Sequence, residues 1–342
     1  MSSWIFEIRD RNGNNPVRLL NARDRNVSIG LNQAGEASFT IDLNDDKALE
    51  SNLKVGRSTL YIYRNGELYF SGIIMIVERI LNESSQYAKV KALGWLFLLS
   101  RRFIGIDADD THTSEDAGAI AWDLIDQTQN ETNGDLSITQ GTIQTSNAIS
   151  ITYTRQNILE AIEDLSAQAG IEFEVSPNKI FNVFYPLRGS DKSSTVILKY
   201  PGSIQTVRSV DDATTIVNNE NGLGKGVGSQ ETVAERDNVG SQSVFGLYQK
   251  IASYKSIDNV TTLGNMVEYD VELNRSPRLT LDLQIHGNTE SPSLSDYGLG
   301  DSVRVRITTT NYNFSQVFRV FEIHVAIDQN DKESVRLIVA LT

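Results

Sequence analysis

Four short segments near the start of the chain recur, in the same order, near its end. Each alternates apolar and polar residues, which is the pattern of a half-buried β-strand. The matching pairs are Phe39–Leu43 with Leu279–Leu283, Val55–Ile62 with Leu299–Arg306, Tyr69–Glu78 with Val317–Ala326, and Tyr87–Leu93 with Ser334–Leu341. We interpret this recurrence as an internal duplication that yields two similar β modules. The alternative is that unrelated antiparallel segments share the pattern by chance.

The charge of the chain is uneven along its length and divides it into three parts. Residues 106–198 hold 4 Lys and Arg against 15 Asp and Glu, whereas residues 1–105 hold 14 against 11. A shift this sharp indicates a domain boundary. The whole chain of 342 residues has a net charge of −13 and no cysteine. The negative charge argues against a general DNA-binding surface. The absence of cysteine excludes a disulfide scaffold and a thiolate metal site.

The first part has the pattern of β structure, and the middle part has a mixed pattern. Asn65 and Gly66 between two alternating runs predict a hairpin in residues 1–105. In the middle part, helical spacing of apolar residues begins after Thr113 and again at Ile158, and Gly170 is typical of a helix end. We therefore predict a small α+β domain at residues 106–198. The residues before it, 1–105, are predicted to form an all-β domain.

A glycine-rich stretch follows, and residues 221–242 are predicted to be a flexible linker. The segment Gly222–Gly228 lacks the spacing of a phosphate-binding loop, because Lys225 is followed by glycine rather than by Ser or Thr. Residues 243–342 are predicted to form a second β domain, with short helices over Val244–Tyr254 and Val260–Leu273. The predicted fold class is mainly β with an α+β insertion.

Patterns that could carry chemistry are weak. The histidines His112, His286 and His324 are too far apart for a zinc-hydrolase motif, although a Ser–His–Asp triad stays open because its members need only meet in space. The acidic segment Asp107–Asp116 departs from an EF-hand loop, which needs glycine at its sixth position and glutamate at its twelfth. A solvated loop and a looser cation site remain as its two interpretations. We predict no enzyme activity, no catalytic, cofactor-binding or metal residue, and no cofactor.

The layout of the chain resembles a known family. The first module, with its hairpin and the segment Tyr69–Gly72, resembles the opening of phage baseplate hub and tail-tip proteins. The last part resembles them through Leu299–Asp301, Phe318–Ile323 and Ser334–Ile338. The family comprises the hub proteins of contractile-tailed phages, the tail hub proteins of siphophages and relatives in type VI secretion spikes. The resemblance extends over nearly the whole chain and rests on loose motifs.

The resemblance implies a structural role. It also implies that the domain at residues 106–198 is inserted into a first tube-like β-barrel domain, which comprises residues 1–105 and is completed by about residues 199–220, and that residues 243–342 form a second tube-like β-barrel domain. A homotrimer with two β-barrel domains per chain would form a pseudo-hexameric ring that continues the tail tube, adapts sixfold to threefold symmetry and provides a DNA channel. The implied partners are distal tail and tail-tube proteins and spike, fibre or tape-measure proteins, with DNA only in transit. The implied location is the tail tip of the virion, after assembly in the host cytoplasm and without stable membrane insertion.

Two further expectations concern the surfaces of such a ring. Apolar side chains such as Ile73 and Val320 would lie between subunits, and acidic residues of the last part would line the channel. His324 is expected at an outward polar position on its strand. An alternative function is a carbohydrate-binding or receptor-binding tail module, in which Tyr61, Tyr63 and Tyr69 would share one face of the first hairpin.

Overall fold

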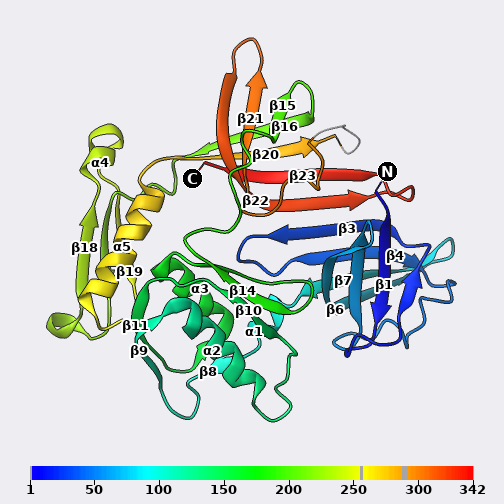
Figure 1. Ribbon diagram of the computed structural model, residues 1–342, viewed down its shortest axis with the longest axis horizontal. Coiled ribbons are helices and arrows are strands. Elements are labelled where there is room, and N and C mark those ends of the chain that lie inside the picture. Colours follow the sequence, from blue (N-terminus) through cyan, green and yellow to red (C-terminus); the bar gives the residue numbers. More distant parts are fainter. Residues whose placement is uncertain (1, 255–256, 287–291, 342) are drawn as a thin grey trace.

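The computed structural model describes residues 2–254, 257–286 and 292–341. Most of the strands belong to one sheet of 13 strands that contains both β modules. Figure 1 shows the first module in blue beside the second module in red, with the other elements on one flank of the sheet. No helix in the described ranges has the length and apolar character needed to cross a membrane.

The first module is an antiparallel sheet in the order β2-β1-β5-β6-β7-β4-β3. Alternate residues of its strands enter a shared core that contains Phe6, Phe39 and Ile62. The period of two follows from the pleat of a strand, which sends successive side chains to opposite faces. The strands are β1 (Trp4–Arg9), β2 (Val17–Leu19), β3 (Arg23–Gly30), β4 (Glu36–Asp42), β5 (Thr59–Arg64), β6 (Glu67–Leu81) and β7 (Gln86–Gly94).

The second module repeats the four central strands in the same spatial order. Strands β21, β22, β23 and β20 correspond to β5, β6, β7 and β4, and the bulges at Met75 of β6 and Phe321 of β22 are equivalent. The predicted duplication is therefore present in the fold, but its register differs: by ladder position Phe39 matches Leu283 rather than Leu279. The strands are β15 (Ile197–Tyr200), β16 (Ile204–Asp212), β20 (Arg278–Ile285), β21 (Ser302–Thr308), β22 (Asn313–Ile327) and β23 (Glu333–Ala340).

One strand pair joins the two modules. The second half of β22 pairs antiparallel with β3, from Glu322 opposite Gly30 to Ile327 opposite Arg25. The apolar residues of both modules consequently form one continuous core. The prediction that residues 199–220 complete the first module is wrong for β16, because this strand pairs with β20 at the far edge of the second module. The β3 edge of the first module is occupied by β22 instead.

The inserted unit lies between the modules in sequence and has its own core. Helix α2 begins after its cap Asp116, and α3 has the predicted extent, from its cap Asn157 to Gly170. The side chain of Asp116 accepts a hydrogen bond from the backbone N–H of Ala119, as an N-cap should. The elements are α1 (Leu96–Leu99), β8 (Phe103–Ile104), β9 (Asp110–Asp116), α2 (Ala117–Gln129), β10 (Thr139–Ile143), β11 (Ala148–Tyr153), β12 (Gln156–Asn157), α3 (Ile158–Ala169), β13 (Glu172–Val175) and β14 (Ile180–Phe184).

The glycine-rich stretch is structured, which corrects the prediction of a flexible linker at residues 221–242. It belongs to a three-stranded sheet, β18-β17-β19, that packs against α5. A side chain at Gly222 would come within 2.4 Å of Val267 on α5, so glycine serves close packing here rather than mobility. The elements are β17 (Asn219–Leu223), the short 3-10 helix η1 (Gly228–Gln230), β18 (Val233–Asp237), α4 (Val239–Phe245), β19 (Gln249–Ser253) and α5 (Val260–Asn274).

The two helix predictions in this stretch have different outcomes. The helix predicted over Val260–Leu273 is present as α5. The helix predicted over Val244–Tyr254 is wrong, because α4 ends at Phe245 and the chain then forms β19, which pairs parallel with β17. Gly246 with φ of 87° turns the chain out of α4 and makes this change of structure possible.

A buried ion pair fixes the inserted unit to the second module. Arg319 of β22 is 3% exposed and donates to both carboxylate oxygens of Glu172 on β13, which is 9% exposed. Arg319 also donates to the backbone carbonyl oxygens of Gly300 and Arg188. A charge removed from water is tolerated only when its hydrogen-bonding capacity is used in this way.

A second set of charges lies between the two modules. Arg64 of β5 donates to Glu333 of β23 at 2.7 Å, and the indole N–H of Trp4 donates to the same carboxylate at 3.0 Å. Arg25 of β3 pairs with Asp331 at 2.9 Å. Burial works to raise the pKa of Glu333, but the hydrogen bonds and the charge of Arg64 outweigh it, and the pKa lies below its ordinary value of 4.5.

We predict that Arg319→Met lowers the free energy of unfolding by about 3–5 kcal/mol, because Glu172 is left buried without its partner. Urea unfolding followed by tryptophan fluorescence measures the effect. The double variant Arg319→Met with Glu172→Gln should recover much of the loss, since it removes the unpaired charge. The exposed Arg306 on neighbouring β21 gives the matched control, and Arg306→Met should change the stability by less than about 0.5 kcal/mol.

We also predict an acid-dependent contribution from Glu333. A carboxylate with a lowered pKa in the folded protein stabilises it above pH 4.5, and this contribution is lost as the pH falls through the lowered pKa. Glu333→Gln should therefore lower the thermal midpoint at pH 7, with a difference from the wild type that shrinks below pH 4.5. Equal differences at pH 7 and in acid would contradict the assignment of the ion pair.

A polar sheet face with two open edges as the candidate functional site

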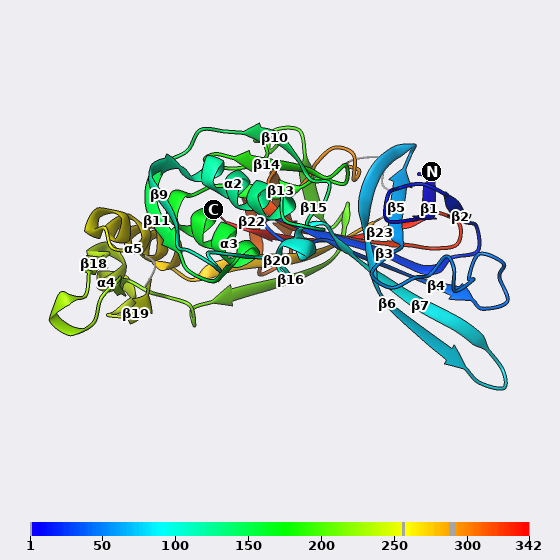
Figure 2. The ribbon, with the colours of Figure 1, turned by 90° about the horizontal axis from the view of Figure 1, so that it is seen from below.

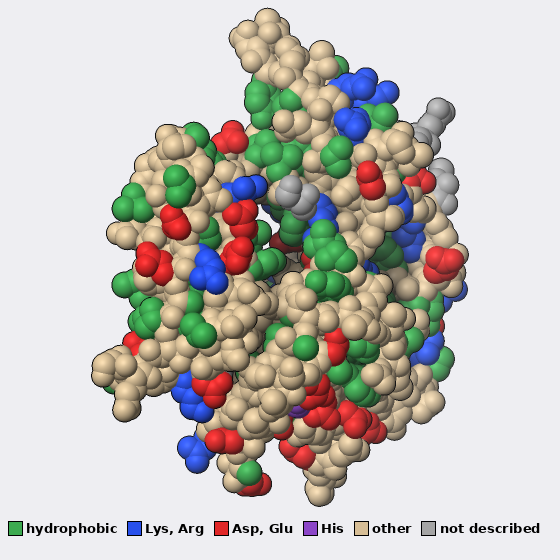
Figure 3. Space-filling model, turned by 60° about the vertical axis from the view of Figure 1, so that its left-hand side comes forward, with side chains coloured by type: hydrophobic (Ala, Val, Ile, Leu, Met, Phe, Trp, Pro, Cys, Tyr) green, Lys and Arg blue, Asp and Glu red, His purple; other side chains and the backbone are tan. Residues whose placement is uncertain are grey.

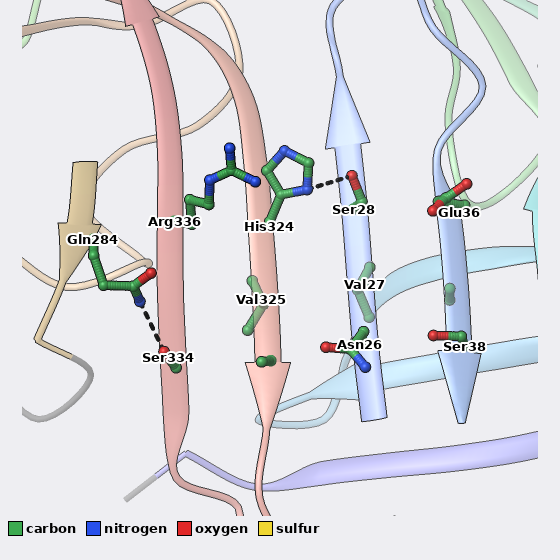
Figure 4. A pocket seen from close by; sticks show the side chains of 12 residues that line it. Asn26, Val27, Ser28, Glu36, Ser38, Gln284, His324, Val325, Ser334 and Arg336 are labelled. Carbon is green, nitrogen blue, oxygen red and sulfur yellow. Dashed lines mark hydrogen bonds between the residues drawn. The ribbon is translucent and has the colours of Figure 1, made fainter. Parts of the chain in front are cut away.

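A polar surface crosses the joint between the two modules. The alternation that sends Val27 and Val325 into the core sends Ser28 and His324 to the opposite face of the same strands. This face is hollowed by about 270 Å³ where β20, β23, β22, β3 and β4 lie side by side. Figure 4 shows the polar side chains at this hollow, which include Asn26, Ser28, Glu36, Ser38, Gln284, His324, Ser334 and Arg336.

The side chains on this face bind one another. The hydroxyl of Ser28 lies 2.8 Å from Nδ1 of His324, whose Nε2 lies 2.9 Å from Glu322. Arg336 donates two hydrogen bonds to Asp282, at 2.8 and 2.7 Å. The hydrogen bonds and the charge of Arg336 hold the pKa of Asp282 below its ordinary value, so this carboxylate stays ionised. The outward polar position predicted for His324 is confirmed.

The charges of the face are balanced. Lys91 pairs with Glu36 at 2.6 Å, and Arg336 pairs with Asp282. Lys89 lies opposite Glu78 in the β6–β7 ladder, and Arg208 lies opposite Asp282 in the β16–β20 ladder. The sequence could not reveal this balance, because it depends on which strands become neighbours.

The cluster of Ser28, His324 and Glu322 contains the three residue types of a hydrolytic triad. Its geometry does not supply the rest of such a site. Ser28 lies in the middle of a strand, between the ladders of β3 with β4 and with β22, on an open sheet face. Acyl transfer also needs preorganised donors for the developing oxyanion and a pocket that holds the substrate. The arrangement fits a hydrogen-bonded surface better than a catalytic centre.

Two strand edges at opposite ends of the sheet are open. Strand β16 pairs with β20 on one side, and no strand of the described residues pairs with its other side. The stretch Ile76–Leu81 of β6 pairs with β7 on one side. Its other side pairs with no strand from the described part of the chain, whereas the same side of the equivalent strand β22 pairs with β3. Figure 2 shows the β6–β7 hairpin projecting at one end of the molecule and β16 apart from it, nearer the middle of the view.

The residues at the β6 edge carry the signature of an interface. Ile76 is 54% exposed and Leu81 is 67% exposed, and Val210 is exposed on β16. By contrast, Ile73 and Val320, which were predicted to lie between subunits, are buried in the core of their own chain. The sequence could have indicated the exposed apolar edge of β6, because apolar residues continue along Ile76–Leu81 beyond the predicted repeat. It did not show which of these apolar residues the chain itself would cover.

The remaining sequence candidates are dispersed. Arg9 stacks on Tyr61 at 4.5 Å and donates to the hydroxyl of Tyr63 at 2.8 Å, whereas Tyr69 packs edge-on against Trp4 in the core. The three tyrosines therefore do not form one platform. His112 lies in the inserted unit with Asp110 and Glu115, where Asp107–Asp116 spans a loop and β9.

The comparison with solved structures identifies proteins of the same architecture. The 43 kDa tail protein of prophage MuSo2 from Shewanella oneidensis aligns over 98% of this chain and 98% of its own, with a TM-score of 0.71 and 11% identity. The tail protein from Neisseria meningitidis aligns over 99% of this chain and 97% of its own, with a TM-score of 0.67 and 13% identity.

A third similarity is to a secretion component. An E. coli component of the type VI secretion system, described as similar to T4 tail proteins, aligns over 97% of this chain and 76% of its own, with a TM-score of 0.54 and 8% identity. No family model and no curated protein matches the sequence. The resemblance to phage tail and type VI hub proteins is thus confirmed in the structure, and the chain has the fold of a tail hub protein.

Proposed function

We propose that copies of this chain join edge to edge into a ring that continues the tail tube at the tip of a phage tail. The observation that carries this proposal is the β22–β3 joint, because the open edges of β6 and β16 are the equivalents of its two partners. By ladder position, β6 corresponds to β22, and β16 corresponds to β3. The joint made once within the chain can therefore be made again between chains.

The internal joint fixes the register of the external one. Each residue of β6 can be matched to one of β22, because the two strands have equivalent bulges and pair with equivalent residues of β7 and β23. Each residue of β16 can be matched to one of β3 in the same way, because these strands pair with equivalent residues of β20 and β4. The resulting antiparallel pairs between neighbouring subunits are Ile76 with Asp212, Val77 with Asp211, Glu78 with Val210, Arg79 with Ser209, Ile80 with Arg208 and Leu81 with Val207.

The side chains suit this register. The exposed Leu81 would cover Val207 on one face of the new ladder, and Arg79 would lie diagonal to Asp211 on the same face. On the other face Glu78 would lie diagonal to Arg208. Cross-strand pairs of opposite charge and of apolar residues each stabilise a sheet by about 0.2–1 kcal/mol. Register and complementarity thus agree without any adjustment of the chain.

A closed ring of such chains accounts for the wider role. Two modules per chain and three chains give six similar positions, which match a sixfold tube on one side and a threefold tip on the other. The polar face would line the channel, where its paired charges leave little net attraction for DNA phosphates in transit. In this role the protein is structural rather than enzymatic, resides in the virion, and binds tail-tube proteins on one side and spike, fibre or tape-measure proteins on the other.

Cysteine cross-linking tests the ring. The chain has no cysteine, so Arg79→Cys with Ser209→Cys introduces the two thiols that the register places opposite each other. Opposed strand residues have Cα atoms about 4.5–5.5 Å apart, which suits a disulfide. Because the two edges lie apart in one molecule, the bond can form only between copies. Oxidation should give covalent trimers on non-reducing gels.

The control moves one thiol beyond the ladder. Glu83 lies past the end of β6 in the hairpin turn, so Glu83→Cys with Ser209→Cys should give far less cross-linked product. Monomers from the Arg79 and Ser209 pair, or equal cross-linking of the control pair, would rule out the proposed joint. A covalent ladder that closes at a number other than three would retain the joint and reject the trimer.

A further inference from the structure

A mixed cluster of metal-ligating side chains lies in the inserted unit, away from the sheet edges. Asp110 and His112 on β9 and Asp123 on α2 bring one ligand atom each to within 4.8 Å of one another. The three residues come from two elements that pack together, so the cluster is a product of the fold rather than of one loop. Figure 3 shows acidic side chains gathered on the lower part of the molecule, where this unit lies, with a histidine among them.

The histidine of the cluster is oriented as a ligand should be. His112 is 6% exposed, and its Nδ1 lies 2.8 Å from Glu115 while its Nε2 lies 3.2 Å from Asp110. Both ring nitrogens thus face carboxylates, and a metal ion would take the place of the Nε2 proton that faces Asp110 while Glu115 keeps accepting the Nδ1–H. Glu115 is therefore the outer carboxylate that fixes the ring, and Asp110 and Asp123 lie on the ligating side.

A buried tyrosine next to the cluster supplies an independent observation. Tyr153 is 2% exposed, and its hydroxyl has no hydrogen-bond partner among the described residues. Its ring meets that of His112 edge-on at 6.3 Å, and it lies opposite Asp110 in the β9–β11 ladder, on the same face. Burial raises the pKa of Tyr153, and the charges of Asp164 and Asp110 raise it further. The ring of Tyr153 thus packs against the histidine of the cluster, and its buried hydroxyl has no partner among the described residues.

We propose that Asp110, His112 and Asp123 bind a divalent transition-metal ion of the zinc class, with Glu115 orienting the histidine. Imidazole and carboxylate together suit zinc, which binds nitrogen and oxygen at about 2.0–2.2 Å in a small four-coordinate site. Calcium fits poorly, because it takes six to eight oxygen ligands and has no preference for imidazole. The fourth position would be taken by water, within reach of the Tyr153 side of the cluster.

The bound ion would act on the stability of the inserted unit. It would tie α2 to β9, a strand without apolar residues that otherwise joins the helix at the Asp116 cap. It would also neutralise carboxylates in the most acidic part of the chain. This role does not depend on the proposed ring, because the ligands all come from one subunit.

Calorimetric titration of the full chain with zinc, after removal of metals by a chelator, tests the site. We expect one ion per chain and a higher thermal midpoint in the presence of zinc, because a ligand that binds only the folded state stabilises it. Asp123→Asn and His112→Gln should each weaken zinc binding by more than about tenfold. Asp123→Asn removes one of several facing charges and keeps the core, so it reports on binding even if His112→Gln unfolds the unit.

The matched control is Asp126→Asn, one turn along the same exposed side of α2. It should bind zinc as the wild type does. Absence of heat and of a midpoint shift with zinc in excess would overturn the proposal. So would unchanged zinc affinity in Asp123→Asn, or calcium binding that matches zinc binding in strength.

Discussion

Strand β22 is the element on which the rest of the structure depends. It pairs with β21 in its first half, with β23 in its second half, and with β3 of the other module along its free edge. Just before the bulge at Phe321, Arg319 turns inward and holds the inserted unit through Glu172. One strand thus positions both modules and the insertion, because its backbone supplies three ladders and its side chain supplies the anchor. The buried arginine links two units, since it donates to Glu172 and Arg188 of the inserted unit and to Gly300 of the second module.

Much of the fold could be predicted from the sequence because most of it is local. The alternation of Phe39–Leu43 and the spacing from Ile158 to Gly170 each depend on neighbours within one element. The duplication could also be found, since both copies use the same strand order. The exact match of Phe39 could not be predicted, because Leu279 and Leu283 occupy similar positions in the sequence pattern and only the ladder with β23 distinguishes them.

The errors share a physical cause. The returning strand β16 was assigned to the wrong module because its pattern is typical of an edge strand and does not specify which edge it joins. The glycines at 222 and 224 were taken as flexible because the sequence does not show α5 lying against them. For the candidate site, the sequence placed His324 on an outward face but did not show Ser28 beside it, since the two residues meet only across the joint between modules. In all three cases the structure depends on contacts between residues that are far apart in the sequence.

When two copies of a module in one chain pair edge to edge, each copy leaves unpaired the edge that is equivalent to the one its neighbour uses. In this chain β22 uses the edge of β3, and no strand of the described residues pairs with the equivalent edges of β6 and β16. The proposed interface between these edges is heterologous, so it would produce a closed ring or an open filament, depending on the rotation between units. The internal joint would set that rotation, since both joints would use the same ladder geometry. In the proposed ring the duplication would therefore encode the curvature of the assembly within a single chain, and an exposed edge that is an aggregation hazard in a solitary protein would become the means of closure.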